Sequence, residues 1–228
     1  MSLMPLPEFD AVIFDMDGTL IDTEGVYMEE WRRAAALQGF ELTEDLWHRF
    51  LGRPTVDCLQ LMKEELGPGF DVEAHVAEWR PRLSERLRHE VPLRPGAPEI
   101  LTMLSEADVP LALATSATRA SAEHYLSVAG LIGHFRHIVT RDDVTLGKPH
   151  PEPFRTAAAA LAVVPERCLA IEDTEAGIRS AHGAGTIPVM VPSLKHPSAD
   201  VAGLCNLICT DLHEVLTHAQ TAWLKKDI

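Results

Sequence analysis

The segment that most constrains the fold is the apolar run at residues 11–14, Ala-Val-Ile-Phe, with the acids that follow it. A short apolar run of this kind is typical of a strand buried on both faces of a parallel sheet. Asp15 and Asp17 come next, and Gly18 then allows the backbone to turn sharply. Ligands of α/β proteins bind at the carboxyl ends of such strands. Two acids there repel each other unless a cation or a shared proton lies between them.

The remainder of the chain falls into two parts with different periodicity. Residues 24–89 show only helical periodicity. Beyond them short apolar runs alternate with helical segments, and strands are predicted at 110–114, 137–140, 168–171, 187–191 and 207–209. This alternation predicts an α/β fold with a doubly wound parallel sheet. Pro188 predicts that the 187–191 strand lies at an edge or that the proline stands at its very start.

The helical stretch is predicted to contain four helices. The first spans 23–37, Thr43 caps a short second helix, and Asp71 caps the fourth. Helical spacing predicts the buried faces of the third and fourth helices: Leu59, Met62 and Leu66, then Val72, Val76, Trp79, Leu83 and Leu87. We therefore expect a core domain of residues 1–21 and 92–228, interrupted by an all-helical domain of residues 22–91.

The charge balance disfavours several classes of partner. The formal net charge is −14, which disfavours nucleic acid and anionic membranes because their phosphates attract Lys and Arg. No apolar run approaches the roughly 20 residues of a membrane-spanning helix. No signal-peptide pattern opens the chain, so we expect a cytoplasmic protein, and we expect a monomer.

The four cysteines, at 58, 168, 205 and 209, contain no Cys-x-x-Cys pair. We expect them to be small buried apolar residues in a reducing compartment, rather than zinc ligands.

Polar groups stand near the ends of several predicted strands, and we expect them to meet in one crevice. Acids, one ammonium group and hydroxyls are what metal-assisted phosphoryl transfer uses as nucleophile, neutralising charge and positioning groups. The residues concerned are Asp15, Asp17, Thr115, Ser116, Lys148, Glu172 and Asp173.

Four segments resemble, in order, the motifs of the haloacid dehalogenase (HAD) superfamily. Asp-Met-Asp-Gly-Thr at 15–19 resembles motif I, and Ala-Thr-Ser at 114–116 resembles motif II. Gly-Lys-Pro-His-Pro-Glu-Pro-Phe at 147–154 is similar to motif III, and Ile-Glu-Asp-Thr-Glu-Ala-Gly at 171–177 to motif IV. The resemblance implies a Rossmann-like core with an inserted helical cap domain of the first type, of the β-phosphoglucomutase and phosphoglycolate phosphatase kind.

The resemblance also implies catalytic and metal-binding roles. Asp15 would be the nucleophile that forms an aspartyl-phosphate, and Asp17 the general acid and base, with a pKa above that of a free Asp. Mg²⁺ would be held by Asp15, by the backbone carbonyl of Asp17 and by Asp173. Glu172 would bind the ion through a water molecule, or would lie next to the residues that bind it directly.

The same resemblance implies how phosphate is bound. The Thr115 hydroxyl and the Ser116 backbone N–H would hold phosphate oxygens, and Lys148 would offset negative charge. Arg53, in a segment similar to the family's substrate-specificity loop, is a candidate substrate contact. The function implied is a Mg²⁺-dependent phosphatase that hydrolyses a small phosphorylated metabolite, such as a sugar phosphate or phosphoglycolate.

Alternatives remain open at this point. Asp17, with the acids at 172 and 173, argues against the dehalogenating branch, and Asp17 also argues against the phosphonate-cleaving branch. A phosphomutase of the β-phosphoglucomutase kind is the main alternative. Tyr27 stands where such mutases carry a cap histidine, which favours a hydrolase. A non-catalytic binding module on a HAD fold is the third hypothesis, and the complete set of acids argues against it.

Overall fold

The computed structural model describes residues 6–50, 55–193 and 195–223. The chain divides into two compact units. One unit comprises the residues up to Asp22 and those from Val91 onward, and the other is Thr23–Glu90. We call them the sheet unit and the helical unit.

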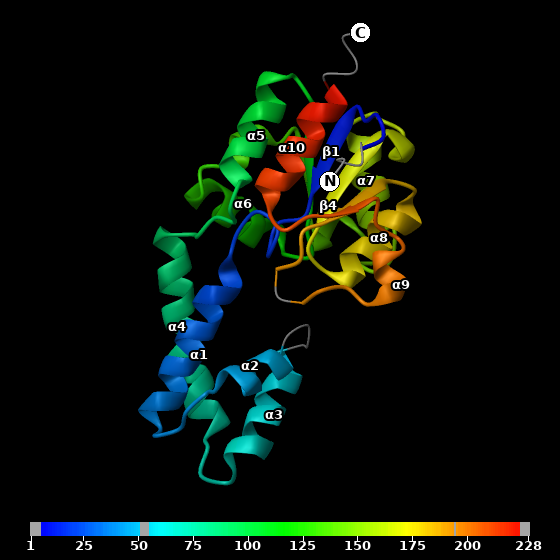
Figure 1. Cartoon of the computed structure of the whole chain (residues 1–228). Coiled ribbons are helices and arrows are strands. Elements are labelled where there is room, and N and C mark those ends of the chain that lie inside the picture. Colours follow the sequence, from blue (N-terminus) through cyan, green and yellow to red (C-terminus); the bar gives the residue numbers. More distant parts are fainter. Residues whose placement is uncertain (1–5, 51–54, 194, 224–228) are drawn as a thin grey trace. The chain divides into compact units, whose positions relative to one another are not determined.

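The sheet unit contains a six-stranded parallel sheet (Figure 1). Its strands lie in the order β3-β2-β1-β4-β5-β6, so that β1 is central, between β2 and β4. The doubly wound α/β fold is thereby confirmed. The strands are β1 (Ala11–Phe14), β2 (Leu111–Ala114), β3 (His137–Val139), β4 (Cys168–Glu172), β5 (Ile187–Met190) and β6 (Leu207–Ile208).

Of the two placements predicted for Pro188, an edge strand or the start of a strand, the structure favours the second. Strand β5 pairs with both β4 and β6, so it is not an edge strand. Pro188 is its second residue, and its carbonyl accepts a hydrogen bond from the backbone N–H of Asn206 at 2.8 Å. The proline is tolerated because it stands near the start of the strand, where fewer ladder donors are needed.

Helices cover both faces of this sheet. Figure 1 shows α5 and α10 side by side on one face, with α7 and α8 on the other. The helices of the sheet unit are α5 (Ala97–Glu106), α6 (Arg119–Val128), α7 (Glu152–Ala160), α8 (Glu175–Ala184), α9 (Ala199–Ala202) and α10 (Leu212–Trp223). Short 3₁₀ turns lie at 132–134, 141–143 and 165–167.

Small side chains fill the interface between the sheet and α7 and α8. This buried cluster contains Ala112, Ala114 and Ala170 from the strands, and Ala157 and Ala181 from the helices. Alanine forms helices readily, and its short side chain allows a helix to approach the strands closely. The approach of α8 in particular fixes one acid of the candidate site, as described below.

The chain leaves and re-enters the sheet unit at one place. Ile21 and Leu93 form an antiparallel bridge. The N–H of Asp22 donates to the carbonyl of Pro92 at 2.8 Å, and the N–H of Arg94 donates to that of Leu20 at 2.9 Å. The two crossings are therefore held side by side by backbone hydrogen bonds.

The helical unit contains no strand among its described residues. Its helices are α1 (Thr23–Leu37), α2 (Glu44–Phe50), α3 (Thr55–Leu66) and α4 (Val72–His89). Both predicted caps are confirmed: Thr43 Oγ1 accepts from the N–H of Leu46 at 3.3 Å, and Asp71 Oδ1 accepts from that of Ala74 at 3.0 Å.

The buried faces of α3 and α4 differ from the prediction. On α3 the buried residues are Cys58 and Met62. On α4 they are His75, Trp79, Leu83 and Leu87, which step by four along one stripe, whereas Val72 and Val76 are half-buried. Apolar periodicity missed His75 because an imidazole is a polar group, and only the packing around it shows that it belongs to the stripe.

His75 is enclosed by aromatic rings in the core of this unit. Its ring centroid lies 5.3 Å from those of Trp31 and Phe70. Neither ring nitrogen has a hydrogen-bond partner among the described residues. Burial lowers the pKa of His75 to about 4, because the charged form is desolvated.

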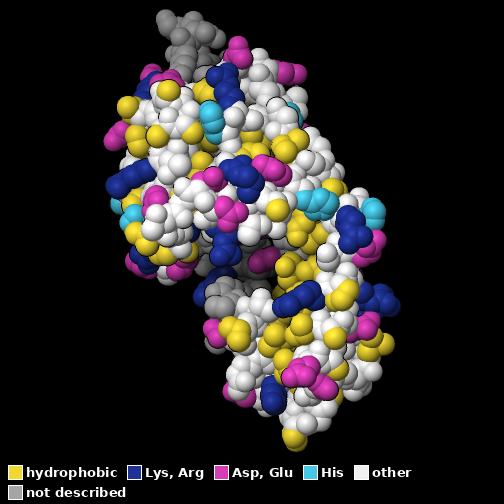
Figure 2. Space-filling view, turned by 180° about the vertical axis from the view of Figure 1, so that it is seen from behind, with side chains coloured by type: hydrophobic (Ala, Val, Ile, Leu, Met, Phe, Trp, Pro, Cys, Tyr) yellow, Lys and Arg dark blue, Asp and Glu magenta, His cyan; other side chains and the backbone are white. Residues whose placement is uncertain are grey.

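The surface carries charged side chains of both signs. On the face shown in Figure 2, Lys and Arg side chains are interspersed with Asp and Glu. Within the part of the chain that the structure describes, no helix has the length and apolar character needed to cross a bilayer.

The burial of His75 makes a prediction about stability. Its pKa is about 4 in the folded state and about 6.5 when unfolded, so below pH 6.5 the unfolded chain binds more protons. The contribution of neutral His75 is complete above pH 6.5 and is lost as the pH falls to 4, by up to about 3 kcal/mol. In His75→Leu, unfolding by urea should therefore lose less free energy between pH 7 and pH 4.5 than in the wild type.

The matched control is His48→Leu, since His48 is exposed on α2 of the same unit. This control should retain the wild-type pH dependence. Equal pH dependence in His75→Leu and the wild type would show that His75 is not held neutral.

Candidate active site

Three carboxylates meet where β1 and β4 end. Asp15 directly follows β1, Glu172 is the last residue of β4, and Asp173 follows it. One oxygen of each lies within 4.8 Å of the others, and all three residues are buried. The N–H of Asp15 donates to the carbonyl of Ile171 at 2.9 Å, which holds the two strand ends in register.

Lys148 lies between two of these acids. Its Nζ is 2.5 Å from Asp15 Oδ1 and 2.6 Å from Glu172 Oε1. The Lys148 side chain is only 6% exposed, and its Nζ stands 5.2 Å from the ring centroid of Phe154. Burial alone would lower the pKa of Lys148, but the two carboxylates outweigh it and hold that pKa above its ordinary value. Lys148 is therefore a permanent positive charge.

The environment of Asp15 favours its protonated form more than water does. Burial raises the pKa of Asp15 to about 7. The Lys148 ammonium acts in the opposite direction, whereas the charges of Glu172 and Asp17 add to the increase. A cation near Asp15 would stabilise the carboxylate and so lower the pKa of Asp15.

Glu172 is fixed on both of its oxygens. Oε2 accepts hydrogen bonds from the N–H of Asp173 and from the N–H and Oγ1 of Thr174, each at 3.0 Å, while Oε1 faces Lys148. Gly177, in the first turns of α8, leaves the necessary room, because a Cβ there would lie 1.7 Å from Glu172 Cδ. These contacts make Glu172 a group that positions Lys148.

Asp173 is held by hydroxyl groups. Its Oδ2 accepts from Ser193 Oγ at 2.7 Å, and its Oδ1 lies 3.5 Å from Thr19 Oγ1. Gly18 has a φ of +82°, and a Cβ there would lie 2.1 Å from Asp173 Oδ2. The sharp turn predicted at Gly18 is confirmed, and its second role, close approach to Asp173, was not predicted.

Asp17 occupies a different place from the three grouped acids. It is half-buried and forms an isolated β-bridge with Ile21, in the turn that follows β1. Its carboxylate is not in the group of three, yet its charge contributes to the raised pKa of Asp15. The assignment of Asp17 as acid, base and metal ligand stays a prediction.

A cavity of about 300 Å³ opens beside Lys148. Thr115, Ser116 and Lys148 all line it, so the ends of β2 and the 147–154 loop are brought together. Thr115 is buried, and its Oγ1 accepts from the N–H of Ala117 at 3.1 Å, which leaves the hydroxyl proton for another acceptor. Arg141 is a further lining residue that was not singled out in the sequence.

Two residues discussed in the sequence analysis belong to the inserted helical stretch. Arg53 lies outside the described residues. Tyr27 belongs to the helical unit, where its ring centroid is 5.9 Å from that of Trp79.

The acids suit a hard divalent cation. Three buried carboxylates face one ammonium group, so negative charge is in excess when all are ionised. Carboxylate oxygens are the ligands that Mg²⁺ and Ca²⁺ prefer. Sequence reasoning missed Ser193, because its contact with Asp173 joins residues 20 apart and follows no local pattern. It also missed the close approach of Gly177 to Glu172, although both lie in the 171–177 segment.

Comparison with known proteins relates this geometry to a family. A model described as haloacid dehalogenase-like hydrolase matches residues 9–185. The phosphorylated carbohydrates phosphatase of Thermotoga maritima is 37% identical over 179 residues, which is 77% of this chain and 82% of the relative.

Solved structures agree with this family. A putative β-phosphoglucomutase from Thermotoga maritima has a TM-score of 0.80 at 32% identity, covering 93% of this chain and 99% of that one. A HAD family hydrolase from Deinococcus radiodurans, solved with bound phosphate and sodium, has a TM-score of 0.82 at 29% identity, covering 95% and 97%. From the matched motifs and the shared fold, the chain belongs to the haloacid dehalogenase-like hydrolases.

Proposed function

We propose that this hydrolase is a Mg²⁺-dependent phosphatase that acts on a small phosphorylated metabolite, of the sugar phosphate or phosphoglycolate type. The observation that carries the proposal is the position of Lys148, which bridges Asp15 and Glu172 and also lines the cavity beside Thr115 and Ser116. A positive charge at that point can neutralise a phosphate in the cavity while it orients the nucleophile.

The reaction begins with attack by the Asp15 carboxylate on phosphorus. A P–O bond to the aspartate forms as the bond to the leaving alcohol breaks, and Asp17 donates a proton to the leaving oxygen. Asp17 then takes a proton from water, which attacks the aspartyl-phosphate and releases inorganic phosphate and free Asp15. The Thr115 hydroxyl and the Ser116 backbone N–H bind phosphate oxygens, and Lys148 keeps the Asp15 carboxylate in place.

Asp15 and Asp173, with the backbone carbonyl of Asp17, would hold Mg²⁺, and Glu172 would support them through Lys148. A bound Mg²⁺ supplies positive charge that brings the phosphate and the nucleophile together. The fit rests on the three grouped carboxylates and on their excess of negative charge over Lys148.

The substrate class rests on the cavity and on the relatives. A cavity of about 300 Å³ is at the lower end of the range for small-molecule sites. The Thermotoga relative is named for its action on phosphorylated carbohydrates, and a similar solved structure holds phosphate.

We also propose that the helical unit is a substrate-selecting cap. Closure of such a unit would exclude water from the reaction.

Asp15→Asn should abolish turnover, with a fall in kcat/KM of roughly a thousandfold or more, because an amide oxygen is a much weaker nucleophile than a carboxylate. Phosphate release from a chromogenic phosphate ester measures this. The control is Asp10→Asn, an exposed residue before the same strand, which pairs with Arg167. Circular dichroism should show both variants folded. Turnover that survives in folded Asp15→Asn would refute the nucleophile.

Chelation should remove the activity reversibly. Treatment with EDTA should reduce phosphate release to the background rate, and Mg²⁺ alone should restore it, since the acids then regain their counter-charge. Full activity in the presence of excess EDTA would exclude a metal-dependent mechanism.

A phosphomutase is the second candidate, favoured by the similar structure described as a putative β-phosphoglucomutase. A panel of phosphorylated metabolites, assayed with Mg²⁺ for both free phosphate and isomerised product, separates the two. We expect phosphate release, because Tyr27 replaces the histidine implied for mutases. Interconversion of hexose phosphates without phosphate release would establish the mutase, and binding without any turnover would favour a non-catalytic module.

A further inference from the structure

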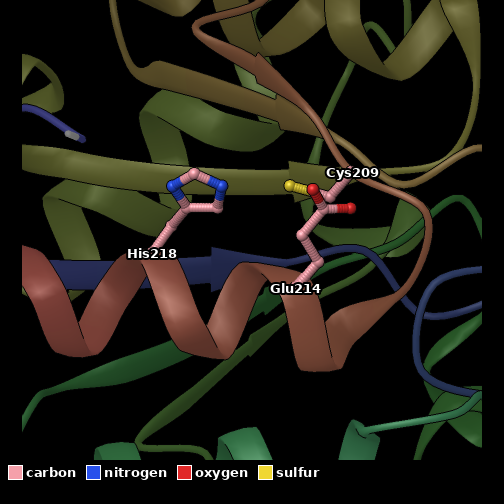
Figure 3. A group of neighbouring side chains, drawn as sticks. All are labelled: Cys209, Glu214 and His218. Carbon is pink, nitrogen blue, oxygen red and sulfur yellow. The ribbon is translucent and has the colours of Figure 1, made fainter. Parts of the chain in front are cut away.

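A second group of side chains able to bind a metal lies between the end of β6 and α10. Figure 3 shows Cys209, Glu214 and His218 pointing toward one another. One ligand atom of each, a sulfur, an oxygen and a nitrogen, lies within 4.8 Å of the other two. Cys209 follows β6, whereas Glu214 and His218 come from α10.

Local structure brings these three residues together. Glu214 and His218 are four residues apart, so that their side chains leave the same face of the helix one turn apart. The N–H of Cys209 donates to the carbonyl of Met190 at 2.8 Å and extends the pairing of β6 with β5. Two ligands from one helix and one from a strand end are thus held on rigid elements.

The orientation of Glu214 is set independently of any cation. Its Oε2 accepts from the N–H and Oγ1 of Thr210 at 2.7 and 3.0 Å, and its own N–H donates to Asp211 Oδ1 at 3.0 Å. These contacts at the start of α10 leave Oε1 of Glu214, which accepts no hydrogen bond from a described residue.

The chemistry of the donors distinguishes this group from the acids at β1 and β4. A thiolate, an imidazole and a carboxylate together match zinc and its neighbours among the transition metals, whereas Mg²⁺ prefers oxygen alone. Cys209 and His218 are 2% and 5% exposed, and Glu214 is half-buried, so the carboxylate side is where an ion and a fourth, water ligand would enter.

We propose that Cys209, Glu214 and His218 form a binding site for one zinc-class divalent cation, separate from the site for Mg²⁺. Binding replaces the S–H bond of Cys209 by a bond from sulfur to the metal, and the proton leaves to solvent. Without metal the thiol keeps its proton, because burial raises the pKa of Cys209 to about 12, with the charges of Glu214 and Asp211 adding to the effect. A bound ion would cross-link the last strand to the last helix.

Cobalt(II) is the probe, because a thiolate bound to it gives a charge-transfer absorption band that oxygen ligands do not give. The full-length protein is titrated with Co²⁺ in excess Mg²⁺, which occupies the oxygen site and has no such absorption. We expect a thiolate band that saturates at one Co²⁺ per chain, is bleached by Zn²⁺, and is accompanied by a higher Tm.

Four variants test the assignment. Cys209→Ser should lose the band. Cys205→Ser should keep it, since that half-buried cysteine lies outside the group. Glu214→Gln and His218→Gln should weaken Co²⁺ binding at least about tenfold, as ligands contribute no less than the outer partners of a metal site. Glu214→Gln retains an acceptor for Thr210, so it separates metal binding from helix capping.

The titration of the wild-type protein tests for the metal site even if a variant fails to fold. Absence of a thiolate band in folded wild-type protein would overturn the proposal. So would a band that persists in Cys209→Ser or disappears in Cys205→Ser, because another cysteine would then be the ligand.

Discussion

The ammonium group of Lys148, shared between Asp15 and Glu172, is the interaction on which the site depends. All three side chains are removed from water, and a buried ion pair is maintained only when each partner is satisfied. The excess of carboxylates over ammonium groups leaves a deficit of positive charge at the strand ends. A divalent cation or a proton can compensate for it. Burial, with the charges of Glu172 and Asp17 adding to its effect, raises the pKa of Asp15 to about 7 and so favours the proton there.

The position of Lys148 also depends on more distant parts of the fold. Lys148 can be placed only if Glu172 is held still, and Glu172 is held by the start of α8, through Thr174 and the space at Gly177. Helix α8 in turn packs on the sheet through small residues such as Ala181. The alanine-rich interface therefore sets a distance that the chemistry uses, rather than merely filling the core.

Local patterns predicted much of this fold and some of the site. The apolar runs that became β1, β2 and β4, and the capping residues Thr43 and Asp71, express rules that act over a few residues. Pro188 left two placements open, because the effect of a proline depends on where in the strand it stands. His75 and Ser193 were missed because their roles arise from neighbours distant along the chain. Gly177 lies only five residues after Glu172, but the sequence does not show how closely the two approach.

The cysteines also show that local sequence patterns miss contacts made only in the folded chain. Their spacing contains no pair, and three of the four are buried, as expected from the sequence. Yet Cys209 has a histidine and a glutamate beside it, because a strand end and a helix face happen to adjoin. Spacing rules find metal ligands only when those ligands lie in one segment or repeat at a known interval.

The paired crossings between residues 20–22 and 92–94 have a consequence for how such a protein can change. Because the insertion leaves and returns through neighbouring hydrogen-bonded backbone, the sheet needs only a short connection there to remain continuous. The helical unit is thus an insertion that can be replaced as a whole. Lineages, or protein engineers, can exchange it for another inserted unit while the ladder of β1, and the charges at its end, stay where they are.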